Sequence, residues 1–172
     1  MVDSQKEVYR YIGLHSPPAW ARNAEAANGF CILGTNAKSS VPALVKIYEQ
    51  NLSPDSQDCT AVALGGIGPM ASEAVPALLK VARDSTNLAR LHSIDALGQI
   101  HANAEIVVPM LTSCLSDGGR SIPERAARAL GRFGTNAQPA IPVLTQLLND
   151  PKKSVRYDAR LAIKQITLEA DP

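Results

Sequence analysis

Histidine and cysteine are the residue types in this sequence that could bind a metal or act as nucleophiles. The histidines occur singly, without the His-x-x-x-His or His-Glu-x-x-His spacing that places two ligands on one helix face. The cysteines are widely separated along the chain, which fits neither a disulfide framework nor a short-spaced zinc site. We therefore expect no metal, no cofactor and no catalytic residue, and free thiols in a reducing compartment such as the cytoplasm. The residues concerned are His15, His92, His101, Cys31, Cys59 and Cys114.

Lysine and arginine could bind an acidic partner or nucleic acid. The chain has 17 basic and 16 acidic residues, a net charge of +1, so no overall field attracts polyanions. Two basic stripes with helical spacing nevertheless lie near the C-terminus. We interpret them as solvated helix surfaces, with an acidic partner as the alternative and nucleic acid as the least favoured ligand. The stripes are Arg125, Arg128 and Arg132, and then Arg156, Arg160 and Lys164.

An internal repeat organises the elements that carry these residues. Four Val-Pro or Ile-Pro pairs recur at a nearly constant interval, and each proline is followed two positions later by leucine. Eight positions before each proline is a glycine, except in the third copy, where it is His101. A period of roughly 33 residues is typical of stacked repeat proteins. The prolines are Pro42, Pro76, Pro109 and Pro142.

Each repeat contains two amphipathic segments with the helical period. The proline is expected at the start of the second helix, where its missing N–H costs least. Glycines recur inside the first helices, which predicts close helix packing, and Cys114 is expected to be an inert core thiol. Gly34 and Gly134 are each followed by Thr-Asn, which favours a helix end and a cap for the next helix. The recurring glycines are Gly65, Gly98 and Gly131.

Residues 126–142 read AARALGRFGTNAQPAIP, and Asp84, Asp117 and Asp150 close the second segments. These units resemble HEAT repeats of the short bacterial type found in phycobilisome lyase-like proteins. The resemblance covers about residues 22–167 and implies an all-α, right-handed α-solenoid of the armadillo/HEAT kind. It is specific for the fold and weak for function, because such repeats serve scaffolds, adaptors and a few enzymes.

The repeat boundaries predict a domain plan. We expect an N-terminal cap at residues 1–21, helix pairs at 22–51, 52–84, 85–117 and 118–150, and a terminal half-repeat at 151–172. Lys164 stands where internal copies have glycine, so Tyr157, Arg160 and Lys164 should form a polar closing face. The alternative is that the array is cut in mid-repeat. No apolar run approaches the roughly 20 residues of a membrane span.

The polar face of the second helices is the main candidate for function, since HEAT-type arrays bind partners there on the concave side. We therefore expect a monomeric, non-enzymatic scaffold for a protein or peptide partner. The alternative from the resemblance is a lyase-like role in attaching or removing a bilin, and nucleic-acid binding at the basic end is less favoured. The candidate binding residues are Lys46, Glu49, Lys80, Arg83, Thr112, Ser113, Thr145 and Gln146.

Overall fold

The computed structural model describes residues 18–119 and 121–168, and every regular element in these ranges is helical. The all-α prediction is confirmed. The first helices of the repeats are α2 (Ala19–Leu33), α4 (Pro54–Ile67), α6 (Arg90–Ile100), α8 (Ile122–Arg132) and α10 (Lys153–Leu168). The second helices are α3 (Val41–Gln50), α5 (Val75–Arg83), α7 (Ala104–Cys114) and α9 (Ile141–Gln146), the last continued by the 3-10 turn η4 (Leu147–Asn149).

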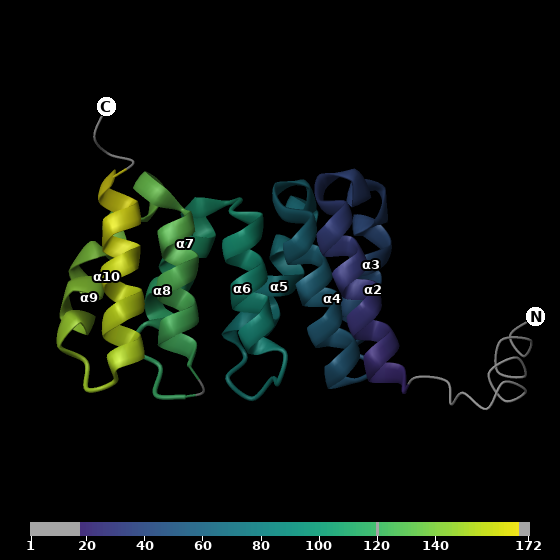
Figure 1. Cartoon of the computed structure of the whole chain (residues 1–172), viewed down its shortest axis with the longest axis horizontal. Helices are drawn as coiled ribbons and strands as arrows, with labels where there is room; N and C mark the ends of the chain where they lie inside the picture. Colours follow the sequence, from purple (N-terminus) through teal and green to yellow (C-terminus); the bar gives the residue numbers. More distant parts are fainter. Residues whose placement is uncertain (1–17, 120, 169–172) are drawn as a thin grey trace, which may run out of the picture.

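The helices form two layers that follow the order of the chain (Figure 1). Each first helix packs side by side with the next first helix, and each second helix packs against the first helix that follows it. Successive second helices touch one another only slightly. This arrangement is the stack of helix pairs that the repeat predicts, because no single pair could bury its apolar face alone.

Glycines permit the close packing of the first helices. A Cβ atom on Gly98 would lie 2.8 Å from the Cα of Ala129 on the next first helix, a distance that real Cβ atoms do not reach. On Gly65 it would lie 3.1 Å from the Cα of Ala96. The prediction of close helix packing at these glycines is therefore confirmed. No recurring glycine brings successive second helices together. The layer of second helices is therefore less closely packed than the layer of first helices.

The first and second helices of three repeats are joined by short 3-10 segments: η1 (Gly34–Ser40), η2 (Gly68–Ala74) and η3 (Gly134–Ala140). Gly34, Gly68 and Gly134 have φ of +52°, +74° and +52°, where glycine is favoured. The predicted Thr-Asn cap of the following helix is wrong. The chain passes from 3-10 to α geometry without a break, so the N–H of Val41 donates to the carbonyl of Lys38 and no side-chain cap forms.

The third repeat departs from this plan. His101 and Asn103 take left-handed φ values of +51° and +54°, and α7 begins directly at Ala104. Pro109 therefore lies inside α7, whereas the other repeat prolines occupy the first helical turn as predicted. For the third copy the prediction of a proline at the helix start is wrong. Two left-handed residues turn the chain within three positions, so the residues that form a 3-10 segment elsewhere become the first turn of α7.

The core is one continuous cluster running from the first to the last described repeat. Leu111 and Leu130 are fully buried, Phe133 is 2% exposed, and Cys114 is buried as predicted. The stretch Pro54–Arg83 is long and apolar enough by composition to cross a membrane. In the structure it comprises α4, η2 and α5, and about half of it is buried inside the protein.

The predicted ranges of the two terminal segments can be compared with the first and last described helices. The helix α2 begins at Ala19, inside the range assigned to the N-terminal cap, while residues 1–17 lie outside the described residues. The range assigned to the terminal half-repeat contains α10. Tyr157, Arg160 and Lys164 are exposed on α10, as a polar closing face requires.

Candidate protein-binding surface

The eight candidate binding residues lie on the second helices, two on each. We call this set the second-helix face. Seven of the eight side chains are exposed and Thr112 is half-buried. Charge separates the two halves of the face, because α3 and α5 carry Lys46, Glu49, Lys80 and Arg83, whereas the candidates on α7 and α9 are uncharged. The members are Lys46, Glu49, Lys80, Arg83, Thr112, Ser113, Thr145 and Gln146.

A groove of about 280 Å³ opens between the C-terminal halves of α3 and α5, and Glu49 and Lys80 line it. Its floor is held by a buried hydrogen-bond network. Gln57 Nε2 donates to the carbonyl of Tyr48 at 3.2 Å, and the Tyr48 hydroxyl lies 2.6 Å from Ser93 Oγ. Burial raises the pKa of Tyr48, so its hydroxyl stays protonated. The groove therefore has a rigid base beneath two oppositely charged, exposed side chains.

A second and wider groove, of about 670 Å³, lies between the N-terminal half of α7 and η3. Its lining is mostly apolar, with Val108, Pro109 and Pro139 beside the polar Glu105 and Thr112. This groove coincides with the irregular third repeat, whose second helix starts early and presents an extra helical turn to the neighbouring 3-10 segment. The sequence signals for it are His101 in place of the repeat glycine and Asn103 two positions later, but they do not reveal a groove.

The hydroxyl groups of the second-helix face are partly engaged by their own helices. Thr112 Oγ1 donates to the carbonyl of Val108, and Ser113 Oγ to that of Met110. Thr145 Oγ1 donates to the carbonyl of Ile141. Each hydroxyl oxygen can still accept hydrogen bonds. The C-terminal half of the face is therefore best suited to donors, such as the backbone N–H groups of an extended peptide.

The two basic stripes do not form one continuous positive surface. Arg125 pairs with Asp95 on α6, and Arg128 Nε lies 3.5 Å from Asp158 Oδ2 on α10. The Nη1 of Arg156 donates to the carbonyl of Asp150 at 2.7 Å. These three side chains thus connect their own helix to another helix or to the preceding connection. The other three members of the stripes, Arg132, Arg160 and Lys164, are exposed and their side chains make no hydrogen bond or ion pair to the described residues.

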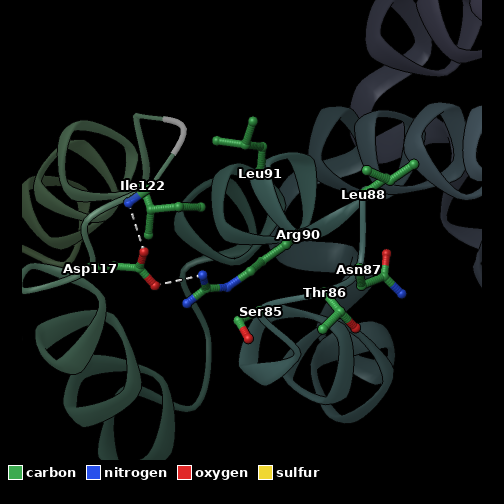
Figure 2. Close-up of a pocket in the computed structure, with 9 residues that line it drawn as sticks. Ser85, Thr86, Asn87, Leu88, Arg90, Leu91, Asp117 and Ile122 are labelled. Atoms are coloured by element: carbon green, nitrogen blue, oxygen red, sulfur yellow. Dashed lines mark hydrogen bonds and ion pairs between the residues drawn. The ribbon is translucent and has the colours of Figure 1, made fainter.

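A third hollow, of about 290 Å³, lies where second helices connect to the next first helices (Figure 2). Arg90 occupies its centre, with Nη1 2.6 Å from Asp117 Oδ2 and Nε donating to the carbonyl of Ala82 at 2.8 Å. The hydrogen bond from Arg90 lowers the pKa of Asp117. Since these donors are already engaged, Arg90 acts as a clamp between repeats rather than as a free ligand-binding group.

This clamp was not among the sequence predictions, although the sequence carries a signal for it. Gln57, Arg90 and Arg156 occupy the same repeat position in the second, third and fifth copies. Each donates from the first turn of a first helix to a carbonyl at or just after the end of the preceding second helix: that of Tyr48, Ala82 or Asp150. A polar column at the start of a first helix therefore predicts a connection between repeats.

The groups with possible chemical reactivity are dispersed in the described part of the chain. Cys31 is exposed, Cys59 is half-buried and Cys114 is buried. Burial raises the pKa of both Cys59 and Cys114, which leaves less of the reactive thiolate. Among the described residues, no three His, Cys, Asp or Glu side chains are grouped as a metal site needs. His92 contacts Asp58, and the ring of His101 meets that of Phe133 edge to face.

The comparisons with known proteins concern the fold. The family model for HEAT repeats matches residues 75–164. No curated protein matches the sequence. An engineered protein of known structure is 21% identical over 85% of this chain and 73% of its own, with a TM-score of 0.62. The complex of CpcE and CpcF of phycocyanin lyase from Nostoc sp. PCC7120 is 24% identical over 78% of this chain and 81% of that chain, with a TM-score of 0.58. At these identities the structural likeness shows the fold alone.

Proposed function

Because the chain belongs to the HEAT repeat family, we propose that it is a non-enzymatic, monomeric interaction module that binds a protein or peptide on its second-helix face. The fold by itself does not assign a partner, so the proposal depends on the surface. The observation that carries it is the contrast between the layers. The first helices are closed against each other by glycine, whereas the second helices leave two grooves lined by Glu49, Lys80 and Thr112.

The grooves favour a polypeptide over a small molecule. They lie along one layer, at opposite ends of neighbouring helices, and an extended segment could contact both. One groove supplies charged groups and the other supplies apolar surface with hydroxyl acceptors. A partner that spans both would gain specificity from the first groove and affinity from the second. The free thiols support a cytoplasmic setting for this role.

Site-specific photocrosslinking in the native host tests this proposal. A benzophenone amino acid at Ser113 or Gln146 should crosslink one and the same protein. The matched site is Gln99, which is exposed on the first helix α6. We expect no crosslink to that protein from Gln99. If Gln99 captures the partner and the two second-helix sites do not, the second-helix face is not the binding surface.

Charge reversal then tests the identified partner quantitatively. Lys80→Glu with Arg83→Glu should weaken binding at least tenfold by titration calorimetry, because repulsion is added to lost attraction. The matched pair is Arg132→Glu with Arg160→Glu, which changes the same charge elsewhere on the surface. It should change binding less than twofold. Should the second pair abolish binding and the first leave it intact, the basic end is the working surface, and an acidic partner or nucleic acid is its ligand.

A lyase-like role with a bilin is the second candidate, supported by the likeness to a phycocyanin lyase complex. The exposed thiol of Cys31 is the one most open to covalent attachment in the described chain. Titration with phycocyanobilin should then shift its visible absorption, and Cys31→Ser should remove any adduct that survives denaturation. No spectral shift at high micromolar bilin would reject this role.

A further inference from the structure

The wide groove between α7 and η3 offers hydrogen-bond acceptors and few donors. Pro109 and Pro139 are exposed parts of its lining, and proline has no backbone N–H. The Thr112 hydroxyl already donates to the carbonyl of Val108 at 2.8 Å, so it is left to accept from a ligand. Of the side chains that line the groove, Asn136 alone has N–H groups left to donate. A group that binds here therefore has to bring donors of its own.

Glu105 is an isolated charge at this groove. It is exposed, and it lines the groove from the first turn of α7. It is the one charged residue of α7, and residues 134–149, which form η3, α9 and η4, contain no charged residue. Among the described residues, none forms an ion pair with it. The carboxylate thus lies beside apolar surface, with no cation on the elements that form the groove.

The narrow groove between α3 and α5 has a different charge balance. Glu49 and Lys80 line it together, so that groove holds both signs of charge. The wide groove holds Glu105 without a counter-charge. A ligand that covered it with apolar surface alone would take water from the Glu105 carboxylate and leave the charge unpaired, which is costly. A ligand with a cation beside its apolar part avoids this cost and is favoured by charge complementarity.

The remaining lining indicates the rest of the ligand. Val108 is 4% exposed and contributes apolar surface beside the rings of Pro109 and Pro139. The volume of about 670 Å³ is large enough to take a large apolar side chain. The oxygens of Thr112 and Asn136 suit the backbone N–H groups of an extended segment. Apolar surface, a carboxylate and backbone acceptors therefore meet in one groove.

We propose that the wide groove binds an extended segment of the partner in which lysine or arginine lies within two positions of a large apolar residue. The apolar side chain packs on Val108, Pro109 and Pro139, and the cation pairs with Glu105. This inference rests on the proposed function, because it names the chemistry of the partner that the second-helix face binds.

Selection of phage-displayed random dodecapeptides on the full-length protein tests this assignment. Peptides selected on the wild type should be enriched in lysine or arginine within two positions of a large apolar residue. On Glu105→Lys, the same selection should enrich aspartate or glutamate at that place instead. The matched variant is Glu25→Lys, which makes the same charge change at an exposed position of α2. It should give the wild-type consensus.

Fluorescence anisotropy with one selected peptide then measures the pairing. Glu105→Lys should weaken binding at least tenfold, and a peptide whose cation is replaced by glutamate should regain most of that loss on this variant. Asn136→Lys places a competing cation on the η3 side of the groove and should weaken the original peptide at least fivefold while the carboxylate remains. Unchanged far-ultraviolet circular dichroism checks that both variants are folded.

The outcomes separate this inference from the proposed function. A consensus without a cation, or the same consensus on the wild type and on Glu105→Lys, would overturn the inference. So would the absence of any enriched peptide, or binding that neither variant weakens. A dimer in sedimentation that Glu105→Lys dissociates would assign the groove to a second copy and also overturn it. The proposed function is decided separately, by whether the crosslinks from Ser113 and Gln146 capture one protein.

Discussion

Several polar and charged side chains on the first helices pair with side chains of the next first helix. Asp58 on α4 faces His92 on α6, with the Oδ1 and Nδ1 atoms 2.9 Å apart. Asp95 pairs with Arg125 at the next junction. At the junction of α8 and α10, Ser154 Oγ donates to Glu124 Oε1 at 2.9 Å. Each partner lies about one repeat away in sequence, so these pairs connect side chains of successive repeats.

Sequence spacing could predict which arginines share a helix face, but not which are free. Arg125, Arg128 and Arg132 have the i, i+3, i+7 spacing of one stripe. Of these, Arg125 and Arg128 are paired with carboxylates, while Arg132 remains exposed. The pairing depends on how far the next helix is rotated, and a single helix sequence does not contain that information.

The Asp58–His92 contact predicts a pH-dependent stability. Interaction with the Asp58 carboxylate raises the pKa of His92 above its ordinary value. The stabilisation is therefore complete below the unfolded-state pKa, about 6.5, and is lost as the pH rises through the higher folded-state pKa. Because both groups are partly exposed, we expect His92→Gln to cost about 0.5 to 1 kcal/mol at pH 6 and close to nothing at pH 9.

Urea unfolding of the wild type, His92→Gln, Asp58→Asn and the double variant at both pH values measures this coupling. The double-mutant cycle isolates the pairwise energy at each pH. A coupling energy that stays constant from pH 6 to pH 9 would show that the charge on His92 is not involved.

At the scale of helices, small residues determine which of the two helix layers packs closely. Gly98 faces Ala129, and Gly131 faces Ala162 and Gln165, so successive first helices approach at backbone contact. This column was predictable from the sequence because glycine recurs once per repeat in segments that otherwise favour helix. The altered start of α7 was only signalled by the sequence: His101 and Asn103 are residue types that adopt left-handed conformations more often than others, but their types do not fix that both of them do so here.

Alanine substitution of two helical glycines separates packing from helix propensity. Alanine stabilises a helix interior by about 1 kcal/mol relative to glycine. At Gly29, where no atom lies within 4 Å of the added Cβ, we expect that gain in the free energy of unfolding. At Gly98 the added Cβ would meet the backbone of Ala129, so we expect a net loss of about 1 to 3 kcal/mol from overpacking.

Both glycine variants can be compared by thermal and urea unfolding under identical conditions. The opposite signs are the essential result. If Gly98→Ala stabilises the protein as much as Gly29→Ala, then α6 and α8 are not in backbone contact.

At the scale of the whole molecule, the array is held together by its junctions. The stack of helix pairs was predictable because four copies of one pattern specify the same core positions, and each copy needs a neighbour to bury them. The two grooves of the second-helix face were not predictable. They arise from the difference in spacing between the two layers and from the irregular third repeat, which exist only after the helices are stacked.

A core truncation in an inner repeat tests how far this stability is shared. Leu111 on α7 is fully buried, and its repeat has a neighbour on each side. Leu111→Ala should lower the free energy of unfolding by about 2 to 5 kcal/mol, the usual cost of removing a buried leucine side chain. Ile32→Ala, at a side chain that is 86% exposed, should change it by less than about 0.5 kcal/mol. In a short array coupled through its junctions, Leu111→Ala should accelerate hydrogen exchange of the slowest amides in α4 and α10 by similar factors. Acceleration confined to α7 and α8 would mean that the repeats unfold independently.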